Sequence, residues 1–188
     1  MLGPSIYLLL TYLVASIPTG PVLATLYAAT DITQHGSGNI GATNVNRLLG
    51  RRFAVATLLG DFTKGLIPVL LAPLVVDASW YTGIVALVAF CGHCWSAYLS
   101  FRGGKGVATA AGAMAALAPL PTLLTAAAWM SVVLVTKRAS VAALVGALAL
   151  PGFVAVIDPA WLWVCLPMAV GVLFRHRSNI QRLATGQK

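Results

Sequence analysis

Three glycines lie among hydrogen-bonding side chains in the segment 35–47, which reads His-Gly-Ser-Gly-Asn-Ile-Gly-Ala-Thr-Asn-Val-Asn-Arg. The glycines match the G-x-G-x-x-G dinucleotide fingerprint, but a long apolar run precedes them where that motif requires a β-strand. Glycine still lets backbone N–H groups approach an anion, and a short helix opening near Thr43 would point its positive end at that anion. The segment predicts either an anion-binding loop or a flexible turn at a membrane surface. The candidate binding residues are Ser37, Gly38, Asn39, Gly41, Thr43, Asn44 and Arg47.

A second segment, Arg102-Gly-Gly-Lys105-Gly106, again joins glycines to cations and leads directly into an apolar run. It is not a Walker A loop, because the pattern G-x-x-x-x-G-K-[ST] is absent. A loop whose only role is to orient the chain in a membrane does not require three glycines around its lysine. Gly104 and Lys105 are therefore candidate phosphate-binding residues, with a purely orienting loop as the alternative.

Two smaller polar segments complete the set. Ser140 follows the turn Thr136-Lys-Arg-Ala and predicts either a helix cap or a ligand contact. In the segment 175–183, a continued helix would place His176 and Asn179 on one face, with Arg175 and Arg182 on a neighbouring stripe. The alternative for that segment is a solvated basic tail.

Asp61 and Lys64 stand three residues apart inside an apolar run, so a helix would let them pair on one face. Ionisable groups are costly inside a membrane and often mark functional sites. A buried structural pair that ties this run to the polar loops is the alternative.

Composition defines the setting of these residues. Of the 188 residues, 59% are hydrophobic and 9% are charged, and the mean hydropathy is +0.89. That charge content excludes an ordinary soluble domain, a disordered chain and a coiled coil. We expect one all-α polytopic membrane domain over residues 1–188, in which seven helices take up the apolar runs 5–27, 53–76, 80–101, 107–117, 121–136, 141–157 and 160–174. The fourth run is short, so either it continues to Pro119 or its neighbours shield it.

The charges predict the orientation of this domain. Eleven of the twelve basic residues fall in the connections after the first, third, fifth and seventh runs, whereas Asp77 and Asp158 lie in the opposite connections. The positive-inside rule then places the N-terminus outside and the C-terminus in the cytoplasm. The net charge of +8 is explained by this orientation, so we expect no nucleic-acid partner.

The remaining motifs argue against other chemistries. Cys91-Gly-His-Cys94 lacks a second ligand pair, and the three cysteines sit in apolar runs, so we expect small core residues and no metal. The sequence shows no acidic cluster, no Ser-His-Asp signature and no His-x4-Asp acyltransferase motif.

The glycines, cations and hydroxyls on one face predict a site for a phosphorylated molecule at the membrane surface. A transporter of a phosphorylated metabolite is the alternative, although the polar residues are one-sided and no inverted repeat is visible.

Four motifs, taken together, resemble one known family. These are Ser-Gly-Asn-Ile-Gly-Ala-Thr-Asn at 37–44, Gly-Asp-x-x-Lys-Gly at 60–65, Gly-His at 92–93 followed by Gly-Gly-Lys-Gly-Val-Ala-Thr at 103–109, and Arg-His-x-x-Asn-Ile-x-Arg-Leu at 175–183. In the order and spacing of these motifs, and in its total length, the chain is similar to the bacterial acyl-phosphate:glycerol-3-phosphate acyltransferases, the PlsY family. The segment 95–101 fits the family less well, since Ser96-Ala97 stands where a bulkier or proline-containing stretch is expected.

The resemblance implies a seven-helix enzyme of the bacterial inner membrane with a cytoplasmic active site. The implied reaction moves a fatty acyl group from acyl phosphate to the 1-hydroxyl of glycerol 3-phosphate, without a cofactor or an obligate protein partner. Ser37, Arg47 and Lys105 match positions that hold the glycerol phosphate group. The loop 38–44 matches the acyl phosphate cradle. His176, Asn179 and Ser140 match further polar contacts, and Asp61, Lys64 and His93 are given supporting roles. The proton goes either to His176 or to the donor phosphate, and we favour the phosphate because no acidic partner for the imidazole is evident.

Overall fold

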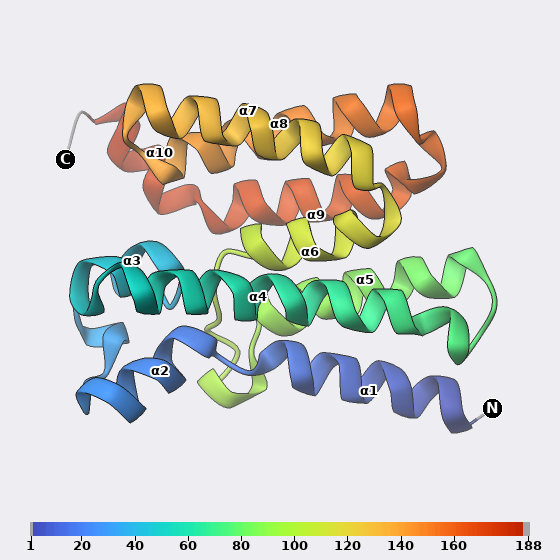
Figure 1. The fold of residues 1–188 in the computed structure, drawn as a ribbon, viewed down its shortest axis with the longest axis horizontal. Helices are drawn as coiled ribbons and strands as arrows, with labels where there is room; N and C mark the ends of the chain where they lie inside the picture. The colour runs from blue at the N-terminus through green and yellow to red at the C-terminus, as the bar shows by residue number, and fades with distance from the viewer. Residues whose placement is uncertain (1, 186–188) are drawn as a thin grey trace.

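The computed structural model describes residues 2–185, and these residues form a helical bundle with no strand (Figure 1). The α-helices are α1 (Leu2–Ser16), α2 (Thr19–Ala28), α3 (Ala42–Leu49), α4 (Arg51–Leu71), α5 (Ser79–Cys94), α6 (Val107–Leu117), α7 (Pro119–Thr136), α8 (Ala139–Ile157), α9 (Leu162–Arg175) and α10 (Arg177–Ala184). Short 3-10 turns occupy Ile32–Gln34, Ala72–Leu74, Ala97–Leu99 and Pro159–Trp161.

The long helices run back and forth along the long axis of the molecule (Figure 1). Helices α7 and α8 pair along one edge, α1 and α2 follow the other edge, and α4, α5, α6 and α9 lie between them. Helices α3 and α10 and the α7–α8 turn share the left end of the view, whereas the α4–α5 and α8–α9 connections share the right end. Three basic segments, at α3 and the start of α4, in the α7–α8 turn and in α10, therefore lie at one end, and the connections that carry Asp77 and Asp158 lie at the other.

The lengths of the apolar helices fit a membrane protein. In the described part of the chain, four helices are long and apolar enough to cross a bilayer: Arg51–Leu74, Ser79–Leu99, Pro119–Thr136 and Ala139–Ile157. The bent pairs α1/α2 and α9/α10, with bends of 46° and 54°, raise the number to six if each pair is one span. The first expected run is therefore broken, and the helix expected over 80–101 ends at Cys94.

The short fourth run is shielded by its neighbours. Helix α6 ends at Leu117 and α7 begins at Pro119, so the expected extension to Pro119 does not occur. Glycine allows α6 to pack very closely on α4. A Cβ on Gly65 would lie 2.2 Å from the Thr109 carbonyl oxygen, and one on Gly112 would lie 2.0 Å from that of Phe62. Small residues thus let the two backbones touch, as is common in membrane helix pairs.

The break between α1 and α2 is stabilised by distant side chains. It falls at Ile17 and Pro18, where the helical hydrogen-bond ladder stops. The Ser16 carbonyl accepts from Ser96 Oγ at 2.6 Å, and the Ile17 carbonyl accepts from Lys64 Nζ at 2.8 Å. Buried carbonyls freed by a break need such partners in a membrane protein.

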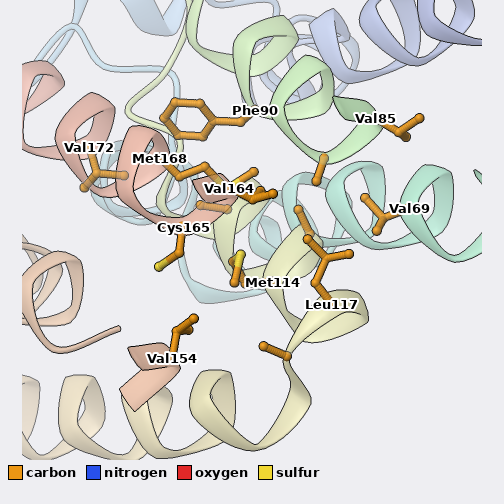
Figure 2. Close-up of a cluster of buried hydrophobic side chains, with 14 of the residues drawn as sticks. Val69, Val85, Phe90, Met114, Leu117, Val154, Val164, Cys165, Met168 and Val172 are labelled. Carbon is orange, nitrogen blue, oxygen red and sulfur yellow. The ribbon is translucent and has the colours of Figure 1, made fainter. Parts of the chain in front are cut away.

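Figure 2 shows the apolar core, to which α4, α5, α6, α8 and α9 all contribute. Cys165 and Met168 of α9 pack there with Phe90 and Met114. The expectation that the cysteines are small core residues is confirmed for Cys94 and Cys165, which are fully buried, while Cys91 is half-buried. This core fixes α5, α6 and α9, whose ends carry the polar loops described next.

Candidate active site

A cavity of about 430 Å³ opens between the first glycine segment and α10. Its volume lies in the range of small-molecule sites. Only Ser37 comes from the glycine segment, and the other lining residues come from the C-terminal end of the chain: Ser178, Gln181, Arg182 and Thr185. The cavity thus joins parts of the chain that are more than 140 residues apart.

The segment before α3 is organised around one buried amide. Asn44 Nδ2 donates to the carbonyls of Ile32 and His35 at 3.2 and 3.0 Å, and its Oδ1 accepts from Ser37 N at 3.0 Å. Gly36 and Gly38 have φ of +61° and +66°, where glycine is favoured. The side chain of Asn44 is fully buried, so it shapes the loop from within.

The predicted short helix is present as α3, which begins at Ala42 after Gly41. Thr43 and Arg47 are exposed on α3, Ser37 and Gly38 are exposed on the loop, and Asn39 is half-buried there. The first glycine segment therefore presents its donors and its cation at an accessible surface.

The second glycine segment is packed between two side chains. On one side, the Gly104 N–H donates to the His93 carbonyl at 3.0 Å. A Cβ on Gly103 would lie 2.0 Å from that carbonyl oxygen, and one on Gly104 would lie 2.1 Å from His93 Nε2. On the other side, Arg175 donates to the carbonyls of Gly103 and Gly104, the latter at 2.9 Å. Any side chain at these glycines would push the loop away from its supports.

Lys105 projects from this loop into a group of cations. Its Nζ donates to Asn179 Oδ1 of α10, which links the loop to the cavity wall. Burial, together with the positive charges of Arg182, Arg175 and Arg47, lowers the pKa of Lys105 from 10.5 to about 8. Cations from four parts of the chain thus converge, and such a cluster is suited to an anion with several charges.

His176 lies buried at the bend between α9 and α10. Its Nδ1 is 2.8 Å from the Val172 carbonyl, which can only accept, so Nδ1 carries the hydrogen and Nε2 is the basic nitrogen. Burial lowers the pKa of His176 and the nearby Lys105 adds to this, although the bond to Val172 opposes them. The lowered pKa favours the neutral form of the imidazole.

The four carboxylates of the chain lie elsewhere. Asp31 caps the 3-10 turn through Thr33 N at 2.9 Å, and its hydrogen bonds to Thr33 lower its pKa. Asp77 and Asp158 lie in the connections at the far end, and Asp61 is buried within α4. None of the four belongs to the lining of the cavity or orients His176 among the described residues.

Asp61 and Lys64 form the expected pair on one face of α4, with Oδ1 and Nζ 2.9 Å apart. Asp61 also accepts from Thr19 Oγ1 at 3.0 Å, and its Oδ1 lies 3.7 Å from His93 Nδ1. Since Lys64 also caps the Ile17 carbonyl, the pair connects α4 with the α1/α2 break and with α5. These contacts favour the structural alternative of a buried pair, which ties α4 to the α1/α2 break and to His93 of α5.

Ser140 lies in the first turn of α8, outside both glycine segments. The helix begins at Ala139, and Thr136 Oγ1 accepts from Arg138 N at 3.2 Å. The cap interpretation of Ser140 is therefore wrong, because the N-cap of α8 is Arg138 and no side chain caps this helix.

Sequence reasoning missed part of the site. Ser178, Gln181 and Thr185 line the cavity with Arg182 but were not predicted. Together with Arg182 they have the spacing i, i+3, i+4, i+7 of one helix face, and this spacing is a signal in the sequence that could have found them. The role of Arg175 as a clamp on the glycine carbonyls has no such signal, because it depends on a contact across 71 residues.

Comparison with known proteins identifies the family. The family model described as Glycerol-3-phosphate acyltransferase matches residues 5–186. The chain is 45% identical over 188 residues to a Glycerol-3-phosphate acyltransferase of Geobacter sulfurreducens, covering 99% of this chain and 96% of that protein. The chain belongs to the glycerol-3-phosphate acyltransferase family.

Two solved structures of an integral membrane family member, PlsY, have the same fold. In its glycerol 3-phosphate form it superimposes with a TM-score of 0.93 at 34% identity, covering 98% of this chain and 94% of that chain. In its lysophosphatidic acid form the TM-score is 0.91 at the same identity, covering 98% and 93%. The expected resemblance and the membrane setting are both confirmed.

Proposed function

We propose that acyl phosphate is the donor for this membrane-embedded glycerol-3-phosphate acyltransferase. The chain acylates glycerol 3-phosphate and yields lysophosphatidic acid, in agreement with its family and with the two structural relatives. One observation carries the donor proposal. Lys105, Arg47, Arg175 and Arg182 converge beside a cavity of about 430 Å³ at one end of an apolar helical bundle.

The chemistry of the donor fits that site. An acyl phosphate combines a phosphate, which the cations bind, with a fatty chain that stays in the bilayer. Each buried CH₂ contributes about 0.8 kcal/mol, so the membrane itself concentrates a long-chain donor. The nucleotide part of acyl-CoA would need a further pocket, whereas the connections of the described bundle are short loops and turns.

We assign the substrate contacts as follows. Ser37, Arg47 and Lys105 bind the phosphate of glycerol 3-phosphate, and Gly104 supplies the rigid backbone that carries Lys105. The loop with Gly38, Asn39, Gly41 and Thr43 receives the donor phosphate at the start of α3, and Asn44 shapes this loop from within. His176 and Asn179 approach the glycerol hydroxyls, and Ser140 makes a further polar contact with the substrate. Asp61, Lys64 and His93 support the second glycine segment.

The reaction needs little general acid–base catalysis by the protein. The 1-hydroxyl oxygen of glycerol 3-phosphate attacks the acyl carbon, the bond from that carbon to the phosphate oxygen breaks, and phosphate leaves with the electron pair. The hydroxyl proton passes to a donor phosphate oxygen, with His176 Nε2 as the alternative acceptor. The protein mainly aligns the two substrates and neutralises their charges.

The same proposal includes a topology. Residues 1–188 form one domain, in which α6 is a seventh, short membrane segment, the N-terminus lies outside and the C-terminus lies in the cytoplasm of a bacterium with the site facing inward. The position of three basic segments at one end of the bundle, opposite the connections with Asp77 and Asp158, supports it. Cysteines placed beside Asp77 and Asp158, in a background without native cysteines, should react from outside the cell, and a cysteine at Arg102 only after permeabilisation. Labelling of both groups from one side would contradict the orientation.

The donor is tested with purified protein, glycerol 3-phosphate and three long-chain donors: acyl phosphate, acyl-CoA and acyl carrier protein. We expect turnover with acyl phosphate alone, at a rate that EDTA leaves unchanged. Equal turnover with acyl-CoA would overturn the donor assignment. No turnover with any donor would favour transport of a phosphorylated metabolite, which uptake into proteoliposomes would measure.

A further inference from the structure

Helix α10 has two distinct faces. Ser178, Gln181 and Arg182 lie on one face and line the cavity together with Thr185. Ile180 and Leu183 fall outside this lining and are partly exposed. The helix is therefore oriented, with one polar side turned toward the site and its apolar residues turned away.

One contact holds this orientation. Asn179 accepts from Lys105 Nζ, which ties α10 to the second glycine segment. The Arg177 guanidinium stacks over the Phe174 ring at 4.8 Å from its centroid, so this arginine is engaged with α9. Of the two arginines of α10, Arg182 lines the cavity and Arg177 does not belong to its lining.

The positive charges around Arg182 favour the binding of an anion. The carboxylates of the chain lie on the Ile32–Gln34 turn, inside α4 and at the far end, and in the described residues only Asp61 forms an ion pair. Arg182 instead lies near another cation, since its positive charge is one cause of the lowered pKa of Lys105. A guanidinium in such surroundings is stabilised by a ligand with two or more negative oxygens.

We propose that Arg182, with Ser178 and Gln181 as neutral partners, binds a substrate phosphate group from the α10 side of the cavity. This inference rests on the proposed function and extends it, because it adds a second wall to the phosphate site. Thr185 lines the same cavity, but its hydroxyl donates to the Gln181 carbonyl of its own helix at 3.1 Å. Two phosphates are available, that of glycerol 3-phosphate and that of the acyl donor, and the experiment separates them.

The test compares Arg182→Gln with the matched control Arg177→Gln on the same helix. Steady-state kinetics with each substrate varied in turn give separate KM values. Loss of one charged hydrogen-bonding partner should raise the KM of one substrate roughly tenfold or more. A rise for glycerol 3-phosphate assigns Arg182 to the acceptor, and a rise for acyl phosphate assigns it to the donor. Arg177→Gln should change both KM values less than about twofold.

A binding readout keeps this test independent of turnover. Millimolar inorganic phosphate should raise the unfolding temperature of the detergent-solubilised wild type and of Arg182→Lys, and should do so less for Arg182→Gln. Unchanged KM values and an unchanged phosphate response in Arg182→Gln would overturn the proposal while wild-type turnover leaves the proposed function intact. A wild type without turnover whose phosphate response depends on Arg182 would instead overturn the proposed function alone.

Discussion

The two glycine segments bring a cation to the same site by opposite means. In the first, Ser37 and Arg47 are exposed, and order comes from the single buried amide of Asn44. In the second, Gly103 and Gly104 are themselves buried between His93 and Arg175. We call the first segment, residues 35–47, the rim, because it is accessible. We call the second segment, residues 102–106, the floor, because its glycines are packed tightly.

This difference matches the residue types. An arginine keeps its charge in any surroundings, so Arg47 suits an exposed rim where substrates arrive. A lysine on a buried floor loses part of its hydration, which is why the pKa of Lys105 falls to about 8. The floor thus holds a lysine whose amine is less basic than usual, and binding of the proposed phosphate would favour its charged form. Sensitivity to substitution should therefore be greatest in the second segment.

The largest effect is expected for Gly104→Ala. The new Cβ would lie 2.1 Å from Nε2 of His93, whose ring is enclosed. The loop must move, and Lys105 moves with it, so kcat/KM for glycerol 3-phosphate should fall at least about 100-fold. Adding His93→Ala should restore part of the loss by opening the space. The control Gly152→Ala meets open space and should leave the kinetics unchanged. Near-normal kinetics of Gly104→Ala would show that the floor is not rigid.

A smaller loss is expected for Asn44→Ala in the first segment. It removes three hydrogen bonds of about 1 kcal/mol each, but the loop is exposed and water can replace part of them. We expect kcat/KM to fall about tenfold, with Asn46→Ala on the exposed side of α3 as the matched control. Equal kinetics of the two variants would contradict the organising role of Asn44.

The pH dependence separates the two cations. Since Lys105 has a lowered pKa of about 8, its ammonium is present below that pH and is lost above it. For the free enzyme, kcat/KM for glycerol 3-phosphate should therefore decline up to about tenfold per pH unit above pH 8. Lys105→Arg should be less active but should lack this decline, because guanidinium stays charged. An unchanged profile in Lys105→Arg would assign the decline to another group.

The smallest effect is expected for Arg47→Lys. The side chain is exposed on α3, so the shorter ammonium can still reach a phosphate through a flexible stem. We expect kcat/KM to change about fivefold or less, measured at constant ionic strength. A loss as large as that of Gly104→Ala would show that the rim is as constrained as the floor.

Sequence alone predicted the all-helical membrane fold, α3 after Gly41 and the Asp61–Lys64 pair, because periodicity and local spacing determine these features. It did not predict the break at Pro18, where Lys64 and Ser96 of distant segments donate to the freed carbonyls. It also did not predict the early end of α5 at Cys94, where the carbonyls of Gly92 and Trp95 accept from Ser16 and Tyr12 of α1. The polar motifs identified Lys105 and Asn179 separately, and only folding brings them into contact. The hydrogen bonds from Arg175 to the carbonyls of Gly103 and Gly104 could not be predicted, because no sequence motif indicates them.

The central claim is that rim and floor hold one and the same phosphate of glycerol 3-phosphate. A double-mutant cycle of Arg47→Gln and Lys105→Gln, measured as kcat/KM for glycerol 3-phosphate at pH 7, tests it most directly. If both cations bind one phosphate, the loss in the double variant should fall short of the sum of the single losses by about 1 kcal/mol or more. Losses that add within about 0.3 kcal/mol would show that the two segments act on separate groups, and would contradict the account.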